Sequence, residues 1–338
     1  MPTAKKKGNQ SIEFVNSPVI TSWASLVGPL EGQGPWSKDF DWITEDYLFG
    51  EKTWEKAESK MLREAVKLSL SKNNLKPEDA EVLLAGDLLN QIISSNYAAR
   101  ELSIPFLGLY GACSTMSESL ILGSILIDGG FYETVISAAC SHHHTAERQY
   151  RFPTEQGVQQ APSSQWTVTG AGAVILQSAG MGPRVTGATI GKVVDMGQTD
   201  VADMGSAMAP AAAQTLKAHL EDMGRLPDYY DLVVTGDLGS VGMAIAVELF
   251  AKDGLFPQPN YSDCGVLIYD KSQGVQSGGS GCGCSAAMLC GPLLKKMTTG
   301  EINRLLFIGT GALMSPVSSF QGETVPGIAH AVAIENSF

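Results

Sequence analysis

Residues 111–130 read GACSTMSESLILGSILIDGG, and this stretch decides the fold. A cysteine between small residues opens it, an apolar run at helical spacing follows from Ser114 to Ile127, and two glycines end it. Residues 278–297 read GGSGCGCSAAMLCGPLLKKM and repeat this order, with Cys284 in the place of Cys113. Because an internal repeat fixes the architecture, we expect the chain to contain one structural unit twice.

The segments around these two stretches repeat as well. Three further pairs of strings correspond: VLLAGDL at 82–88 with LVVTGDL at 232–238, VISA at 135–138 with LFIG at 306–309, and GAVIL at 172–176 with HAVAI at 330–334. The first half is longer between its last two strings, and the excess falls in the polar stretch from Ser141 to Gln165. This excess makes that stretch a candidate pocket wall or dimer contact.

The apolar runs predict strand, helix, strand, helix, strand, strand in each half, with an amphipathic helix ahead of each. The predicted strands are Val82–Ala85, Phe106–Tyr110, Thr134–Ala139, Gly172–Gln177, Leu232–Thr235, Cys264–Tyr269, Leu305–Gly309 and Ala329–Ile334. The predicted helices are Trp54–Leu70, Ser94–Leu102, Ser114–Ile127, Ala207–Met223, Gly242–Lys252 and Ser285–Met297. Two sheet-and-helix halves with mixed strands favour five α/β/α/β/α layers around one shared core.

Composition excludes several classes of protein. The 338 residues carry a formal charge of −12, which argues against a nucleic-acid partner. Lys5 to Lys7 read as a solvated N-terminal tail, and no apolar stretch approaches the ~20 residues of a membrane-spanning helix. The six cysteines show neither a disulfide framework nor zinc-finger spacing, so we expect no bound metal and a reducing compartment.

Cys113 and two aspartates are the first candidates for a site. A cysteine between a strand and a helix faces the first amides of that helix, whose dipole favours the thiolate and lowers its pKa. Asp87 and Asp237 each follow the first predicted strand of a half. The favoured interpretation of both is a turn-capping aspartate, and the alternative is that one of them faces a ligand pocket.

The five histidines divide into three groups. For His142 and His330, a ligand contact and a satisfied buried histidine remain equal alternatives. His143 and His144 read as a polar turn, since neighbouring side chains on an extended segment point to opposite faces. His219 lies among charged residues on an amphipathic helix and is expected at the surface.

These features together resemble the thiolase fold, the fold of thiolases and ketoacyl-acyl-carrier-protein synthases. Longer strings are similar to the stage V sporulation protein AD family of endospore-forming bacteria, from about Val15 onward. They are AGDLLNQ at 85–91, GACSTMSES at 111–119, SHHHTAERQYR at 141–151, DMGSAMAPAAA at 203–213, GGSGCGCSA at 278–286 and IAHAVAIE at 328–335. The resemblance implies an α/β, thiolase-like, five-layered αβαβα fold. Its divisions are a flexible tail at 1–14, an N-terminal half at 15–195 and a C-terminal half at 196–338.

The sequence departs from the enzymes of this fold at the places that matter for catalysis. Those enzymes pair the reactive cysteine with histidines, or with a histidine and an asparagine, from the second half. The matching positions here, 235–237, 281–283 and 309–310, offer no imidazole. Losing one oxyanion donor alone costs ~100- to 1000-fold in rate. The prediction is therefore a catalytically silent protein with no catalytic residue, and the alternative is an active acyltransferase that uses Cys113.

The resemblance also implies a ligand. The family is taken to bind dipicolinic acid, alone or as its calcium chelate, and to support its uptake into the developing spore. The predicted ligand-binding residues are Asp87, Cys113, Ser114, His142, Asp237, Cys284 and His330. Amides at Cys113–Ser114 and Cys284–Ser285 are candidate donors for its carboxylates, with Arg148 and Arg151 more distant.

The resemblance implies a cellular setting as well. The expected partners are the other stage V sporulation A membrane proteins and a second copy of the chain, with no cofactor. The expected location is the forespore, peripheral at the spore inner membrane, without a transmembrane segment. A structural scaffold with no ligand is the third alternative.

Overall fold

The computed structural model describes residues 5–150, 161–255 and 259–336, and ten of the strands in these ranges form two sets of five. The first set is β3 (Val19–Val27), β5 (Val82–Gly86), β6 (Phe106–Gly108), β7 (Thr134–Ser141) and β9 (Gly170–Gln177). The second set is β10 (Arg184–Thr189), β11 (Leu232–Thr235), β12 (Tyr261–Asp263), β14 (Arg304–Ala312) and β15 (Gly327–Glu335). The repeat predicted from the sequence is therefore present in the structure.

Both sets have the same topology. Their orders in space are β6-β5-β7-β9-β3 and β12-β11-β14-β15-β10, so that in each set the first strand of the chain lies at one edge and the third at the other. In chain order, the second, third and fourth strands of each set run parallel to one another. The fifth strand pairs antiparallel with both the fourth and the first. One residue pair, Arg184 with Val19, joins the two sets.

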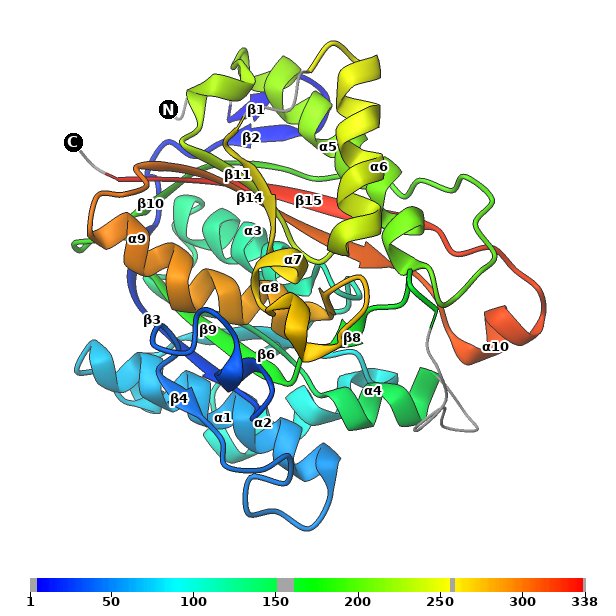
Figure 1. Cartoon of the computed structure of the whole chain (residues 1–338). Coiled ribbons are helices and arrows are strands. Elements are labelled where there is room, and N and C mark those ends of the chain that lie inside the picture. Colours follow the sequence, from blue (N-terminus) through cyan, green and yellow to red (C-terminus); the bar gives the residue numbers. More distant parts are fainter. Residues whose placement is uncertain (1–4, 151–160, 256–258, 337–338) are drawn as a thin grey trace.

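The helices complete five layers, which Figure 1 shows from the side. The outer helices are α1 (Trp54–Lys72) and α2 (Ile93–Leu102) on the first sheet and α5 (Met204–Met223) and α6 (Gly239–Lys252) on the second. The central layer consists of α3 (Thr115–Asp128) and of α8 (Cys282–Met288), which a π-helical segment (Leu289–Leu293) connects to α9 (Leu294–Thr298). The thiolase-like αβαβα architecture is confirmed.

Small residues allow the central helices to lie close to both sheets. A Cβ on Gly123 of α3 would approach the Ser137 Oγ of β7 to 2.9 Å, and one on Gly172 of β9 would approach the Ala286 carbonyl of α8 to 2.4 Å. Phe307 and Leu120 are fully buried between these layers. Cavity costs make such packing sensitive to single substitutions. The central layer therefore holds the start of α3 in a fixed position.

Shorter elements surround the two sheets. They are β1 (Lys6–Lys7), β2 (Ser11–Glu13), β4 (Trp42–Ile43), α4 (His143–Tyr150), β8 (Trp166–Thr167), α7 (Cys264–Leu267), β13 (Gly279–Ser280) and α10 (Pro316–Phe320). No helix of the described ranges has both the length and the apolar character to cross a membrane.

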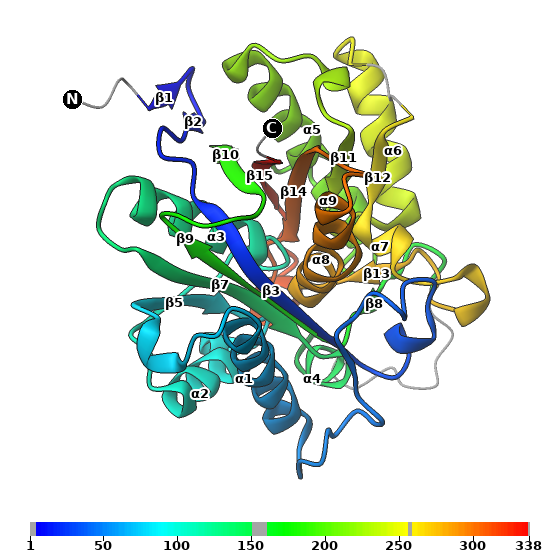
Figure 2. The same ribbon diagram turned by 90° about the vertical axis from the view of Figure 1, so that its left-hand side faces the viewer.

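Two predictions about the first 14 residues and the boundary between the halves need correction. Residues 5–14 are not a flexible tail: β1 pairs with β2, and β2 pairs antiparallel with β10 (Figure 2). β10 belongs to the second sheet, so the change from one sheet to the other falls between Gln177 and Arg184, ahead of the predicted boundary at 195. The hairpin is held because its edge extends an existing sheet.

The predicted strand Cys264–Tyr269 is wrong. The strand is β12, which ends at Asp263, and Cys264 begins the short helix α7. The Asp263 carboxylate accepts the Val266 amide at 3.1 Å and so caps this helix. A short apolar run fits a strand and a buried helical turn equally well, and the cap decides between them.

Candidate functional site

Cys113 lies in a tight turn between β6 and α3. Ala112 has a φ of 49°, a left-handed conformation that is uncommon without glycine. The Ser114 hydroxyl donates to the Gly111 carbonyl at 2.7 Å and closes the turn. A Cβ on Gly311 of β14 would lie 2.6 Å from that same carbonyl, so the second sheet presses against the turn. The strained turn thus presents Cys113 toward the second half.

A carboxyl group from the second half meets the Cys113 thiol. Asp237 and the Ser280 hydroxyl lie close enough to Cys113 to act on the pKa of its thiol through charge and hydrogen bonding. Asp237 Oδ1 accepts from the Thr310 hydroxyl at 2.7 Å, while Oδ2 accepts from the Ser280 hydroxyl at 3.0 Å and from the Gly281 amide at 2.9 Å. The structure therefore brings together two of the predicted residues, Cys113 and Asp237.

Burial and charge act against a thiolate at Cys113. Its side chain is 5% exposed, and burial raises the pKa of the thiol well above its ordinary value. The Asp237 carboxylate, the neighbouring Cys282 and the hydrogen bond to Asp237 raise it further. The expected lowering of this pKa by the helix dipole is wrong, because desolvation and a nearby negative charge outweigh the dipole here. A raised pKa disfavours the thiolate, which is the nucleophilic form of a cysteine.

The groups that shift the pKa of Cys113 include no histidine among the described residues. The His142 Nε2 donates to the Tyr47 carbonyl at 2.8 Å, and its Nδ1 accepts the His144 amide at 3.2 Å. Burial lowers the pKa of His142 to about 4. His142 is thus a satisfied, neutral, buried histidine in this structure, the second of its two alternatives.

The remaining histidines lie elsewhere. His143 stacks on Trp166 at 3.6 Å between ring centroids and is buried, and His144 stacks on Trp54, so this segment is part of an aromatic cluster and of α4 rather than a polar turn. The prediction of a surface position for His219 is wrong, because its side chain is fully buried. Its ring bonds to the hydroxyl groups of Thr189 at 2.7 Å and Tyr230 at 2.6 Å.

His330 lies on β15, away from the contacts of Cys113. Its Nδ1 accepts the Gly191 amide at 3.1 Å, and burial lowers its pKa to about 4. Together with Glu118 of α3 it lines a small cavity of ≈ 140 Å³. A ligand contact at His330 stays a prediction, at a different place from the Cys113 contacts.

Asp87 has the geometry of a capping aspartate. Its Oδ1 accepts the Leu89 amide at 2.9 Å, and its Oδ2 accepts both the amide and the hydroxyl of Ser95 at 2.7 Å. The carboxyl is fully buried. These three donors fit the favoured interpretation, a carboxylate that holds the connection from β5 to α2.

The predicted amide donors at Cys284 and Ser285 lie inside α8. The helix begins at Cys282, so the Cys284 amide already donates to the Gly281 carbonyl at 2.9 Å. The amide of Gly283 donates to Ser141 Oγ at 3.0 Å. These two amides at the start of α8 are therefore occupied by protein acceptors, and Cys284 itself is buried.

The two arginines expected near the site have separate outcomes. Arg148 is half exposed on α4, where it forms an ion pair with Glu55 and lies over the Trp54 ring at 5.7 Å. Arg151 lies outside the described residues. In the part of the excess stretch that is described, residues 143–150 form α4, and residues 161–165 lead into β8.

Several groups near Cys113 are missing from the sequence prediction. Thr310 and Ser280 orient Asp237, while the Tyr110 and Tyr150 hydroxyls lie 3.2 Å apart and Tyr150 also donates to the Leu88 carbonyl. The charge of Cys113 acts on the pKa of both tyrosines, which places them near the thiol. Adjacency of Tyr110 to the Gly111 turn was the one available signal. The others come from a helix, α4, and from two strands, β13 and β14, that are far away in the sequence.

No described group of three or more His, Cys, Asp or Glu side chains is arranged to hold a metal ion. All six cysteines are buried and free. The chemistry that the described residues bring to Cys113 is therefore that of thiol, hydroxyl and carboxyl groups.

Comparison with known proteins identifies the family. The family model of stage V sporulation protein AD matches residues 8–335. The chain belongs to the stage V sporulation protein AD family. Stage V sporulation protein AD of Bacillus subtilis (strain 168) is 45% identical over 333 residues, which cover 98% of each chain. The family is therefore one of sporulation proteins.

Solved structures support the fold of this family member. Synthase III for 3-oxoacyl-[acyl-carrier-protein] from Aquifex aeolicus superposes with a TM-score of 0.60 at 14% identity, covering 94% of this chain and 99% of its own. OleA from Xanthomonas campestris superposes with a TM-score of 0.62 at 12% identity, covering 97% of this chain and 100% of its own. At such identities the likeness shows the fold alone.

Proposed function

We propose that this protein is a catalytically silent thiolase-fold protein that binds dipicolinic acid, alone or as its calcium chelate, and supports its uptake into the developing spore. The observation that carries the proposal is the pairing of Cys113 with the Asp237 carboxyl, where acyl-transfer chemistry needs a base and oxyanion donors. A carboxylate beside the thiol repels the negative charge that an acyl-transfer intermediate develops. The membership in a sporulation family fits a role in spore formation.

Binding remains chemically reasonable after catalysis is lost. The buried thiol of Cys113 and the hydroxyls of Ser280 and Thr310 are neutral donors around one carboxyl, Asp237. A bare dicarboxylate meets repulsion from Asp237, whereas its neutral calcium chelate does not. Asp237 takes over the role that we considered for either aspartate, since its carboxyl lies beside Cys113, whereas the hydrogen bonds of Asp87 go to residues near it in the sequence. Calcium dipicolinate is therefore the favoured form of the ligand.

Titration calorimetry of the purified protein tests this function. We expect saturable binding of dipicolinate that is tighter with calcium than without it. Asp237→Asn should tighten the binding of free dipicolinate, because it removes the repelling charge, so that the advantage of the calcium form shrinks. Asp87→Asn is the matched control at the equivalent place of the first half. Equal affinities with and without calcium would count against the role of Asp237, and absence of any binding would remove the proposal in favour of a scaffold.

Mass spectrometry after incubation with an acyl-coenzyme A tests the alternative. We expect no covalent adduct, because the raised pKa of Cys113 and the absence of a histidine among its described contacts leave the thiol protonated. An acyl adduct that disappears in Cys113→Ala would establish the acyltransferase instead. The same variant separates thiol chemistry from binding, since a binding protein retains part of its dipicolinate affinity.

The proposal includes a setting in the forespore, peripheral at the spore inner membrane, with the other stage V sporulation A membrane proteins and as a homodimer. A free sheet edge supports the dimer: β6 pairs only with β5 among the described strands, and its Leu107 is 52% exposed. Light scattering of purified protein and fractionation of sporulating cells test these points. A monomer in solution, or a protein confined to the soluble fraction, would contradict the respective part.

A further inference from the structure

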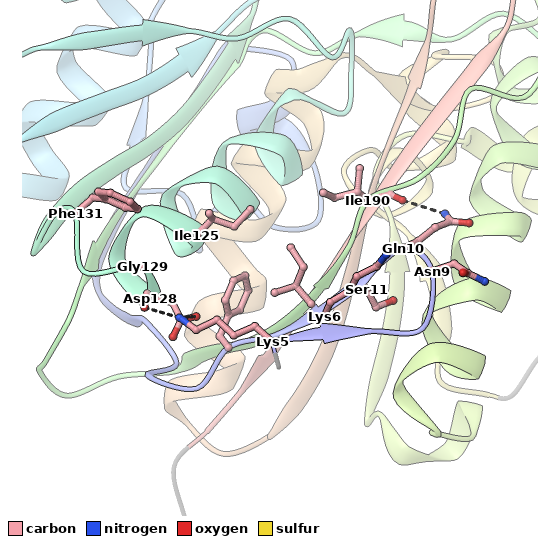
Figure 3. A pocket seen from close by; sticks show the side chains of 12 residues that line it. Lys5, Lys6, Asn9, Gln10, Ser11, Ile125, Asp128, Gly129, Phe131 and Ile190 are labelled. Carbon is pink, nitrogen blue, oxygen red and sulfur yellow. Dashed lines mark hydrogen bonds and ion pairs between the residues drawn. The ribbon is translucent and has the colours of Figure 1, made fainter. Parts of the chain in front are cut away.

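A groove lies between the N-terminal hairpin and the C-terminal part of α3, away from Cys113. Its cavity measures ≈ 660 Å³, within the roughly 300–1,000 Å³ of small-molecule sites. Apolar side chains from three regions form its walls: Ile12 of β2 with Phe14 directly after it, Ile125 of α3, and Phe131 and Ile190 from loops. Figure 3 shows Ile125 and Ile190 pointing into the same space. None of the groups that contact Cys113 lines this groove.

Two of the apolar side chains that line the groove are exposed to solvent. Phe131 is 73% exposed and Ile190 is 45% exposed, although both side chains are large and apolar. Exposed apolar surface in a concave site is typical of a place where an apolar group binds. Ile190 also lines the smaller cavity next to Glu118 and His330, so the two cavities adjoin at this side chain.

The groove and the smaller cavity beside it differ in charge. At the hairpin end, Lys5 is neutralised by Asp128 at 2.6 Å, but Lys6 is exposed and no ion pair joins it to another described residue. Glu118 lies at the other end. In a chain of formal charge −12, an unpaired ammonium beside an apolar groove favours one anionic group at that end. The carboxyl at the opposite end disfavours a second one.

We propose that this groove binds a single-chain amphiphile of the fatty-acid class, with its carboxylate at Lys6 and its hydrocarbon chain along α3 between Ile125 and Ile190. The hydrocarbon chain covers the apolar walls, and the ammonium selects the negative head group. The site is separate from the dipicolinate site and does not rest on that proposal.

Calorimetry with sodium dodecanoate as the probe tests the amphiphile site. We expect saturable binding of one dodecanoate per chain and much weaker binding of dodecyltrimethylammonium, which has the same chain and the opposite charge. Lys6→Glu should weaken dodecanoate binding about 3- to 10-fold, the size of an exposed charge contact reversed in sign. The matched control is Lys52→Glu, another exposed lysine without a described ion pair, which should bind dodecanoate normally.

Two variants test the position of the hydrocarbon chain. Ile125→Glu places a charge on the apolar wall and should weaken binding more than about 10-fold. Phe131→Ala removes an exposed side chain without touching the core and should weaken it several-fold, so the proposal stays testable if Ile125→Glu unfolds. Equal binding of the two amphiphiles would overturn the proposal, and so would unchanged dodecanoate binding in Phe131→Ala. A third contradicting result is no dodecanoate binding by the parent together with a smaller solution mass in Ile125→Glu. The last result would assign the groove to a contact between two copies.

Discussion

Asp87 and Asp237 occupy equivalent places in the two halves, directly after the stretches that form β5 and β11, yet they contact different groups. All of the hydrogen bonds of Asp87 go to Leu89 and Ser95, near it in the sequence. Asp237 instead bonds across the molecule to Thr310, Ser280 and Gly281 and meets Cys113. A duplicated position has thus been kept as a local cap in one half and has become part of the site in the other.

A third aspartate explains how this difference is possible. Asp263, at the end of β12, accepts the amides of Leu238 and Gly239, both at 2.9 Å, and the Thr235 hydroxyl at 2.7 Å. It therefore holds the connection from β11 to α6, which is the task of Asp87 in the first half. Because Asp263 satisfies these buried donors, Asp237 is free to face Cys113. The two halves share a topology but distribute their carboxylates differently.

Removal of this substitute cap should give the largest effect. Asp263→Ala leaves the buried amides of Leu238 and Gly239 and the part-buried amide of Val266 without an acceptor, and we expect a loss of about 3–5 kcal/mol in the free energy of unfolding. Urea denaturation measures it. The control is Asp270→Ala, which removes an exposed cap on Ser272 and should cost less than about 1 kcal/mol. Similar losses in both variants would break the assignment of the cap to Asp263.

The outer helices of the two halves bury different titratable groups, and these groups make the stability of the protein depend on pH. α5 buries His219, whose pKa burial lowers to about 3, whereas α1 buries Glu58, whose pKa burial raises well above its ordinary value. A histidine that stays neutral in the folded protein and takes up a proton in the unfolded one lowers the free energy of unfolding as pH falls below 6.5. A glutamic acid that stays protonated in the folded protein lowers the free energy of unfolding as pH rises above 4.5, because the unfolded chain then releases its proton. His219 of α5 and Glu58 of α1 therefore contribute to the pH dependence of stability with opposite signs.

His219→Gln separates the histidine contribution. Between pH 7.5 and pH 5, the parent should lose about 2 kcal/mol more than the variant, because the unfolded imidazole is protonated over this range and the folded one is not. The free energy of unfolding at both pH values measures this difference. His142 and His330 remain in both proteins and cancel in the comparison. An unchanged slope would show that His219 takes up its proton in the folded state.

The sequence predicts the repeated elements well because each unit carries its own apolar runs. It fails where a position depends on a partner far along the chain. His219 reads as a surface residue because its helix also carries charges, and only the fold reveals that Tyr230 and Thr189 cover it. β3 and β10 are absent from the predicted elements, although they are the edges at which the two sheets meet.

The candidate site shows the same limit. Cys113 is predictable from its glycine-flanked turn, and Asp237 from the repeat. Their contact is not, because it depends on the tertiary approach of β14 to that turn, which Gly311 permits. Matching letters also placed Cys284 at a helix start, whereas α8 begins at Cys282. A shift of two residues is enough to turn a supposed free amide into a helical one.

The smallest effect tests the contact that distinguishes the two aspartates. Asp237→Asn removes a negative charge beside Cys113 and should lower the pKa of the thiol, so alkylation by iodoacetamide at pH 8.5 should become about 3- to 10-fold faster. Asp87→Asn is the matched control, because the Asp87 charge is not among the groups that shift Cys113. Mass spectrometry of the Cys113 peptide follows the reaction without interference from the other cysteines. If both variants react at the parent rate, the Cys113 thiol does not sense the Asp237 charge, and the separation of roles between the two aspartates loses its chemical consequence. Faster alkylation in Asp237→Asn alone would show that the second half suppresses a nucleophile that the first half still presents.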